Sequence, residues 1–299
     1  MPLHGLPRND RCNPGAKPLK PTSFRYHRPT TLKEALALLD VHGDDARPLA
    51  GGQSLVAMMN LRLARPSVLV DLNAVDELFG IRLDGEVLRI GAMTRQASIL
   101  ASALVNQRAP LVSLALKHVG HFQTRSRGTV GGSLAHADPS AELALAMVTL
   151  GAKFRLQSVD NERIVDAREF FVDAMTTVVG SGEIVSEVMI RVESGAAKVA
   201  FREYSRREGD FAIVSAAAHK SQSEDTLLVG VGGVGAVPRF CRQLSIALSK
   251  APFDADVAAE LVRSELEQIE AISDLNADGA YRRHVASQFL LEVIREVLE

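Results

Sequence analysis

The sequence predicts an α+β protein, from its length and from the order of its segments. Its 299 residues amount to about two domains. Helical and strand-like segments alternate in the first part, and from about residue 184 four strand-like segments precede three helical runs. This order favours an antiparallel sheet covered by C-terminal helices in the second domain. We place a flexible tail at 1–20, a first domain at 21–181 and a second at 182–299.

Composition excludes several classes of protein. With 46% hydrophobic and 23% charged residues the chain is of ordinary globular type. A net charge of -2 gives no electrostatic basis for binding nucleic acid or anionic lipid. The longest strongly apolar run, Leu143 to Ala152, is far shorter than the ~20 residues that span a bilayer. Cys12 and Cys241 are too few for a disulfide scaffold, or for an iron–sulfur cluster with its ~4 ligands.

Each element of the first domain has a local signal. Thr31 and Glu34 form a capping box before a helical run that ends at Gly43. Asp84-Gly85 between two apolar stretches predicts a hairpin. The other expected elements are strands at 47–49 and 68–72, a helix from 55, hairpin strands at 81–83 and 87–90, helices at 94–105 and 110–118, and a buried helix at 141–151.

The second domain is expected to contain strands first and helices afterwards. The strands are expected at 184–192, 198–204, 212–220 and 226–231, and the helices at 241–250, 253–269 and 281–298. The N-terminal twenty residues are rich in proline and lack the apolar core of a secretory signal. A reducing, cytoplasmic location is therefore the default expectation.

Two glycine-rich loops are the most informative features. Gly51-Gly52 lies between a strand and a helix, and Gly128-x-x-Gly131-Gly132 lies in a long polar loop, 118–133, before the buried helix. Successive backbone N–H groups free of side chains form concave anion sites, and a helix start adds positive charge. Each loop alone is more often a tight turn. Together, and each flanked by Ser or Thr, they favour a clamp on the two phosphates of a dinucleotide.

A third glycine motif points elsewhere. Gly230-x-Gly232-x-x-Gly235 matches the dinucleotide-binding fingerprint, but Pro238 falls where the required helix should begin. No βαβ unit follows, so we expect a bulged strand and a turn.

Polar clusters near the second loop leave alternatives open. His118, His121, His136 and Asp138 have spacings that could hold a metal, although polar side chains in glycine loops commonly fix the loop backbone. Glu142, one turn after Asp138, suits either the start of a helix or a ligand hydroxyl. The charged run around Arg202 is expected to be mostly a solvated face. Without a G-x-S-x-G elbow or a suitably placed Cys, hydrolase chemistry has no support.

Three segments carry a family resemblance. Ala50–Leu55, Arg127–Glu142 and Ser205–Ala212 resemble the FAD-binding subunit of molybdenum hydroxylases, a group that includes the medium subunit of carbon monoxide dehydrogenase and the flavin part of xanthine dehydrogenase. The resemblance runs from about Pro21 to the C-terminus. It implies a two-subdomain flavin fold of the vanillyl-alcohol-oxidase (PCMH) type in 21–181, followed by the C-terminal domain of the flavin subunit.

The resemblance also implies how the cofactor is held. Both glycine loops should wrap the FAD pyrophosphate through main-chain N–H groups, Glu142 should bind a ribityl or ribose hydroxyl, and Arg202 and Phe211 should lie near the flavin. The full set of implied cofactor-binding residues is Pro48, Leu49, Ala50, Gly51, Gly52, Gln53, Ser54, Leu55, Val119, Thr129, Gly131, Gly132, Ser133, Glu142, Val185, Arg202 and Phe211. No metal ligand and no catalytic side chain is implied.

The implied function is that of one subunit in a three-part enzyme. A large partner would carry molybdopterin, a small partner [2Fe-2S] clusters, and this chain FAD that passes electrons to NAD⁺, a quinone or oxygen. The assembly implied is a dimer of heterotrimers. Two alternatives stay open: a stand-alone flavin oxidase, and a non-catalytic subunit that binds the nucleotide for assembly.

Overall fold

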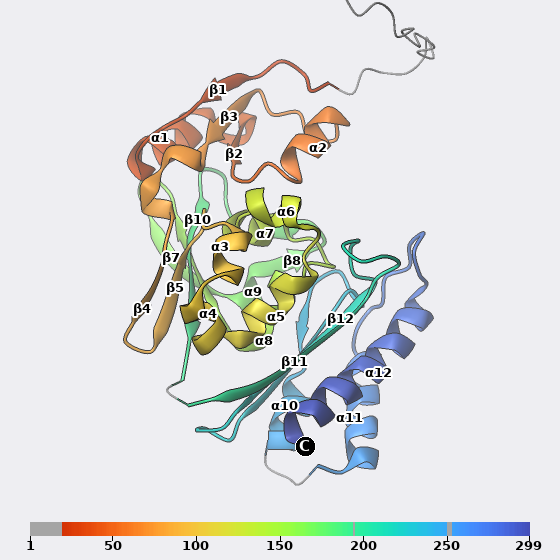
Figure 1. Cartoon of the computed structure of the whole chain (residues 1–299). Coiled ribbons are helices and arrows are strands. Elements are labelled where there is room, and N and C mark those ends of the chain that lie inside the picture. The colour runs from red at the N-terminus through yellow and green to blue at the C-terminus, as the bar shows by residue number, and fades with distance from the viewer. Residues whose placement is uncertain (1–19, 194, 250–252) are drawn as a thin grey trace, which may run out of the picture.

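The computed structural model describes residues 20–193, 195–249 and 253–299. The tail predicted over residues 1–20 therefore lies, apart from Lys20, outside the described residues. Three larger sheets and a two-stranded one, with helices between and beside them, confirm the predicted α+β class (Figure 1).

The N-terminal sheet is parallel and has the strand order β1-β3-β2. Helix α1 packs on it through Ala35, Leu36 and Leu39, which are buried. Thr31 caps this helix by accepting the N–H of Glu34, whereas the Glu34 carboxylate accepts the N–H of Thr30, one residue earlier than a capping box requires. The elements are β1 (Arg25–His27), α1 (Leu32–His42), β2 (Ala46–Leu49), α2 (Leu55–Asn60) and β3 (Val68–Asp71).

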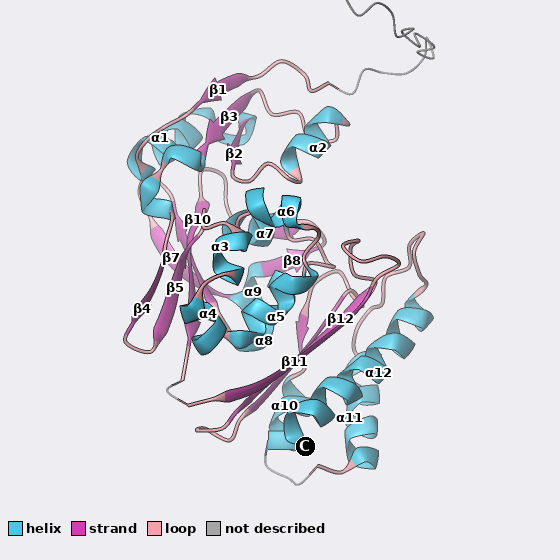
Figure 2. Ribbon diagram, viewed as in Figure 1, coloured by secondary structure: helices cyan, strands magenta, loops and turns pink. Residues whose placement is uncertain are grey.

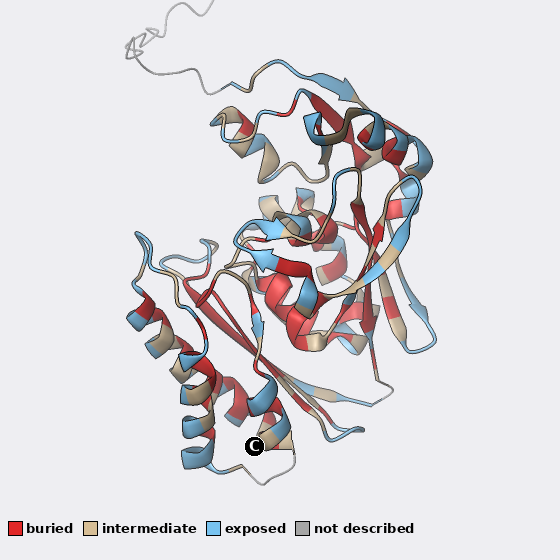
Figure 3. Ribbon diagram, turned by 180° about the vertical axis from the view of Figure 1, so that it is seen from behind, coloured by how far each residue is buried: buried red, intermediate tan, exposed pale blue. Residues whose placement is uncertain are grey.

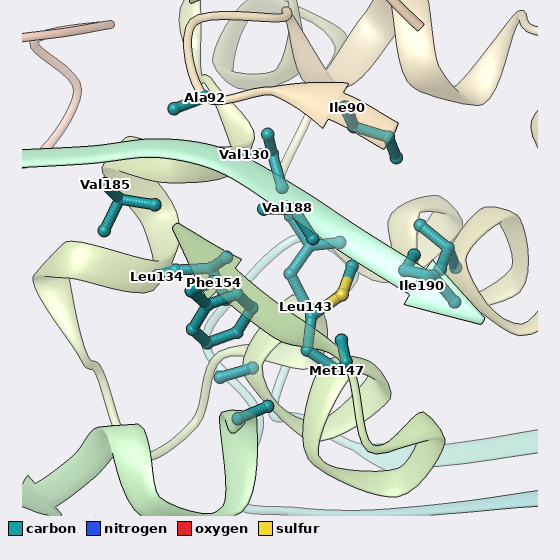
Figure 4. Close-up of a cluster of buried hydrophobic side chains, with 14 of the residues drawn as sticks. Ile90, Ala92, Val130, Leu134, Leu143, Met147, Phe154, Val185, Val188 and Ile190 are labelled. Carbon is teal, nitrogen blue, oxygen red and sulfur yellow. The ribbon is translucent and has the colours of Figure 1, made fainter. Parts of the chain in front are cut away.

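The central sheet is antiparallel and carries the largest hydrophobic core. Helices α7 and α8 pack on this sheet, and Figure 4 shows Leu134 and Leu143 meeting Phe154 and Val188 in that core. The strands in spatial order are β4 (Ile81–Asp84), β5 (Val87–Gly91), β10 (Ile184–Arg191), β6 (Lys153–Gln157) and β7 (Glu162–Asp166).

The position of β10 corrects the predicted domain boundary. This strand pairs with β5 on one side and β6 on the other, so it is the central strand of the first domain's sheet. The sequence alone predicts this strand in the second sheet, because it begins a run of four strand-like segments. Its side chains are buried on both faces, and such a segment has no period that reveals its partners. The chain passes from one sheet to the next between Arg191 and Ala197.

The C-terminal sheet is antiparallel, as predicted, in the order β11-β12-β13-β14. Its three helices follow the strands and pack on one face, while α5 and α8 cover the other face (Figure 2). The elements are β11 (Ala197–Tyr204), β12 (Val214–Ser221), β13 (Leu227–Gly232), β14 (Arg239–Phe240), α10 (Arg242–Ser249), α11 (Ala255–Glu267) and α12 (Gly279–Leu298).

The segment between β5 and β6 is more helical than predicted. The expected helix at 94–105 divides at Ala101, and the expected loop at 118–133 contains α6 and the start of α7. Helix α8 is buried on nearly every side, as predicted, because it lies between two sheets (Figure 3). The helices between β5 and β6 are α3 (Gln96–Leu100), α4 (Ala103–Arg108), α5 (Pro110–His118), α6 (Phe122–Arg127), α7 (Val130–His136) and α8 (Glu142–Leu150). Helix α9 (Ala167–Phe170) and the short strands β8 (Phe171–Asp173) and β9 (Thr176–Thr177) follow β7.

The third glycine motif is a packing feature. Gly230 and Gly232 lie in β13, whose ladder shows no bulge, and the chain then turns into β14 rather than into a helix. A Cβ at Gly230 would overlap the hydroxyl of Thr149 on α8, so glycine allows the sheet to approach that helix closely. Within the three described ranges, no helix has the length and apolar character needed to cross a bilayer.

Candidate functional site

A cleft of about 600 Å³ opens where the N-terminal sheet, the central helices and one loop of the C-terminal domain meet. Its walls come from the β2–α2 loop, from residues between Val119 and Glu142, and from the β11–β12 loop at Gly209 to Phe211. In Figure 1 helix α2 lies above α6 and α7 in this region. The three parts are far apart in sequence, so the cleft exists only in the folded chain.

Most of the residues that the sequence predicted for the cofactor line this cleft. They are Pro48, Ala50, Gly51, Gly52, Gln53, Ser54, Leu55, Val119, Thr129, Gly131, Gly132, Ser133, Glu142, Val185 and Phe211. The two glycine loops, Ala50–Leu55 and Gly128–Ser133, therefore belong to one site.

Two predicted residues are not brought to the cleft. Leu49 is the last residue of β2 and is absent from the wall. Arg202 lies on β11 with its guanidinium toward α12, where its Nε is 3.4 Å from Glu292. The alternation of a strand explains this position, because Phe201 faces α5 and α8 and its neighbour must face the opposite side. The structure therefore does not bring Arg202 to the cleft, and its expected place beside the flavin stays a prediction.

The two loops touch each other through their glycines. A Cβ at Gly51 would overlap the carbonyl oxygen of Arg127 and stand 2.9 Å from the Cα of Gly128. A Cβ at Gly132 would stand 2.8 Å from the hydroxyl of Thr129 and 3.2 Å from the Cβ of Ala50. Glycine is therefore required at the first position because two backbones approach there.

The amide groups of the two loops are used differently. In the part of the chain that the structure describes, no protein acceptor takes the N–H groups of Gly51, Gly52, Gln53 or Ser54. Backbone polar groups are normally satisfied, so these amides are available to a ligand or water. Gly52, with φ of +74°, adopts the left-handed conformation that turns the loop.

Apart from that of Thr129, the amides of the second loop are already bonded within the protein. Val130 and Gly131 donate to the carbonyls of Thr94 and Ala92, and Ser133 donates to the carbonyl of Thr129. The N–H of Gly132 donates to the hydroxyl of Thr129, which caps α7. Both loops were expected to offer main-chain N–H groups to the phosphates. In the structure, the free N–H groups come mainly from the first loop.

Several cleft residues were missed by the sequence analysis. Met58, Met93, Gln96 and Met175 line the wall, and no local pattern marks them because they come from unrelated elements. Gly209 and Asp210 also line it, and they lie within the segment Ser205–Ala212 that carried the family resemblance. That segment was thus a usable signal.

The histidines near the second loop do not form a metal site in the part of the chain that the structure describes. Among the described residues no group of three or more His, Cys, Asp or Glu side chains could hold a metal ion. A Cβ at Gly209 would overlap the ring of His121, so this histidine packs directly on the loop from the other domain. His136 lines the cleft, and burial lowers its pKa below the usual value.

Glu142 supplies the buried acid of the site. It lies at the first position of α8 and its residue is 7% exposed. Burial raises its pKa from 4.5 to about 8, and the nearby charges of Glu203 and Asp138 add to the effect. The side chain is therefore mostly protonated at neutral pH, and a carboxyl in that form can both donate and accept a hydrogen bond.

The residues present fit a flavin nucleotide. The free amides of the first loop suit a diphosphate, which accepts hydrogen bonds from successive N–H groups. Val119, Val185 and Phe211 offer apolar surface for a ring system, and Glu142 can bond a sugar-chain hydroxyl. Arg125 fixes the wall beside Val119 by donating to the carbonyls of Val119 and Gly120, both at 2.7 Å.

Comparison with family models gives matches over both domains. Residues 22–191 match the model described as FAD binding domain in molybdopterin dehydrogenase, and residues 199–297 match that of the CO dehydrogenase flavoprotein C-terminal domain. The border between the two matches coincides with the passage from β10 to β11.

Individual relatives match over nearly the whole chain. The 6-hydroxypseudooxynicotine dehydrogenase complex subunit alpha of Paenarthrobacter nicotinovorans is 34% identical over 94% of this chain and 96% of its own. The carbon monoxide dehydrogenase medium chain of Afipia carboxidovorans is 34% identical over 92% of this chain and 96% of its own. A solved structure of carbon monoxide dehydrogenase from Hydrogenophaga pseudoflava superposes with a TM-score of 0.89 at 31% identity, over 93% of this chain and 98% of that one.

Proposed function

The chain belongs to the family of FAD-binding subunits of molybdenum hydroxylases, and we propose that it holds FAD in the cleft and passes electrons from a partner's iron–sulfur clusters to an external acceptor. Its relatives are dehydrogenase subunits, and the chain is accordingly an oxidoreductase subunit. The observation that carries the proposal is the row of unbonded amides in the first loop, in a cleft that a buried acid also lines.

The chain's own residues bind and orient the cofactor. Amides of Gly51 to Ser54 hold the diphosphate, and the second loop supports them from behind through the contact of Gly51 with Arg127. Glu142 bonds a hydroxyl of the ribityl chain or ribose. When bound, FAD supplies the redox chemistry itself, so the protein contributes position and electrostatics.

The remaining centres of the enzyme are assigned to partners. Two cysteines cannot supply the ~4 ligands of an iron–sulfur cluster, so such clusters would be on a small subunit and molybdopterin on a large one. The proposed assembly is a dimer of heterotrimers in the cytoplasm. NAD⁺, a quinone and oxygen are the candidate acceptors, and the substrate would be selected by the large subunit.

The test is the visible absorption spectrum of the purified chain, with acid release and identification of the chromophore. Released FAD without an iron–sulfur shoulder supports the proposal, and a colourless chain that takes up no added FAD contradicts it. Expression with candidate partners then separates the alternatives. Substrate oxidation by the isolated flavoprotein would indicate a stand-alone oxidase, and a flavin that stays oxidised in a working complex would indicate an assembly role.

A further inference from the structure

The packing between the C-terminal sheet and helices α5 and α8 is apolar along most of its length and becomes polar at one end. In the apolar part, Phe201 and Ala217 of the C-terminal sheet pack against α5 and α8. Two residues farther along β11, on the same face, stands Glu203. Burying an unpaired carboxylate costs free energy, so an acid at this position suggests a functional role.

The Glu203 side chain is buried, and one of its carboxylate oxygens lacks a hydrogen-bond partner in the described structure. The side chain is 4% exposed, and the oxygen without a partner is Oε2. The Nδ1 atom of His118, at the end of α5, is 3.9 Å from that oxygen, and the His118 side chain is 37% exposed. Directly across the ladder on β12, the hydroxyl of Ser215 is also buried without a partner.

Glu142 continues this cluster into the cleft. It begins α8, which packs on β12, and it lines the cleft wall. The charge of Glu203 contributes to the raised pKa of Glu142, and burial raises the pKa of Glu203 itself to about 7. His118 is therefore the partly exposed member of this cluster, and Glu142 is the member that lines the proposed cofactor site.

Burial disfavours the charged forms of His118 and of the two acids, and nearby charges add to this for His118 and Glu142. Burial lowers the pKa of His118, and the positive charges of Lys117 and Arg202 lower it further. Asp138, on the loop before α8, raises the pKa of Glu142. The other charged neighbours, Glu292 and Glu296 of α12, face Arg202 on the opposite side of the sheet.

We propose that Glu142 and Glu203 form a carboxyl pair that takes up one proton when the flavin is reduced, and that His118 connects the pair with water. When two electrons arrive from the partner's clusters, negative charge increases in the cleft. His118 takes a proton from water at one ring nitrogen and gives its Nδ1 proton to Oε2 of Glu203, which forms an O–H bond. When the acceptor removes the electrons, that bond breaks and the proton returns to water.

This inference rests on the proposed function, and the first experiment uses the FAD-loaded chain. The midpoint potential of the flavin is titrated from about pH 6 to about pH 9, a range that brackets the two raised pKa values. One additional proton taken up with two electrons steepens the potential by about 30 mV per pH unit. We expect that steeper range in the wild-type chain and its loss in Glu203→Gln. Equal slopes in the two proteins would overturn the proposal.

Two further variants separate a proton role from a structural one. Glu187→Gln replaces a buried acid that pairs with Arg89 in the central sheet, outside the cleft, and should keep the wild-type slope. His118→Gln should also keep the slope but slow the uptake of protons after rapid reduction, followed with a pH indicator. An unchanged uptake rate would remove His118 from the path.

A measurement without cofactor distinguishes failure of this inference from failure of the proposed function. In the FAD-free chain, the protonated carboxyl of Glu142 should give an infrared carbonyl stretch that persists to about pH 8. Glu203 should add a second band that disappears as the pH rises through about 7, and Glu203→Gln should lack that added band. Absence of this band in the wild-type chain overturns the carboxyl pair. A chain that shows the band but takes up no FAD would contradict the proposed function instead.

Discussion

The two glycine loops look alike in sequence and serve the cleft differently. Segment Ala50–Leu55 leaves its amides without protein acceptors, whereas segment Gly128–Ser133 uses most of its amides to begin α7 and to bond the chain after β5. Glycine in the first loop allows both a left-handed turn and a close backbone contact. Glycine in the second allows α7 to pack against Ala92. A glycine-rich loop at a nucleotide site is therefore as much a packing device as a phosphate ligand.

The comparison predicts that Gly51→Ala has the largest effect on cofactor binding. The new Cβ would overlap the carbonyl oxygen of Arg127, a backbone atom that cannot move away cheaply. The first loop must then shift and its amides lose their alignment, so we expect loss of FAD from the purified chain, measured by absorbance and acid release. Gly195→Ala is the matched control, since Gly195 is exposed and lies outside the cleft. Full FAD content in Gly51→Ala would contradict the role of the first loop.

Glu142→Gln tests whether the buried acid that lines the cleft carries a proton in the folded chain. The pKa of Glu142 is raised from 4.5 to about 8 in the folded chain, so between these values the folded state holds a proton that the unfolded state has released. Stability of the FAD-free chain therefore falls as pH rises across this range. Glutamine stays neutral and avoids that loss.

The expected result is a melting temperature advantage of Glu142→Gln over wild type that grows with pH and levels off above about pH 8. Thermal unfolding at a series of pH values measures it. Glu187→Gln, at a buried acid paired with Arg82 and Arg89, should show no such growth. A constant difference at every pH would mean that Glu142 is ionised in the folded chain.

The sequence predicted the elements of this fold better than their partners. The capped helix α1, the hairpin at Asp84-Gly85 and the buried helix α8 were each confirmed, because their signals lie within a few residues. The sheet to which β10 belongs was predicted wrongly, since pairing with β5 and β6 depends on residues up to about a hundred positions away. A strand buried on both faces carries no mark of its neighbours.

The candidate site was likewise predicted in its residues but not in their contacts. The residues of the cleft were found largely through the family resemblance, and the structure brings most of them together. What the sequence could not show was the use of each amide, because that depends on whether Thr94 and Ala92 stand within reach of the second loop. The orientation of Arg202 toward α12 was likewise decided by strand alternation and by the acids of α12.

Gly131→Ala should reduce stability more than it affects the ligand. A Cβ at Gly131 would stand 2.5 Å from the Cβ of Ala92, and overpacking of this kind costs about 1–3 kcal/mol. We expect a lower free energy of unfolding in urea for the FAD-free variant. Adding Ala92→Gly should restore part of the loss, because it removes the nearest overlapping atom, the Cβ of Ala92, and leaves the carbonyl oxygen of that residue, at 2.9 Å, as the closest contact. A Gly131→Ala chain of unchanged stability would show that α7 can move away from this strand end.

Thr129→Ala should have the smallest effect, and it tests the comparison most directly. The substitution removes the hydroxyl that caps α7 and accepts the N–H of Gly132 at 3.1 Å, a loss of about 1 kcal/mol. Thr31→Ala is a matched control, because Thr31 caps α1 in the same way, at 3.2 Å from the N–H of Glu34, and lies away from the cleft. Both variants should lose similar stability in urea unfolding and keep wild-type FAD affinity in equilibrium titration. If Thr129→Ala alone weakens FAD binding by tenfold or more, a difference of about 1.4 kcal/mol, the second loop contributes ligand contacts of its own and the two loops share the phosphates after all.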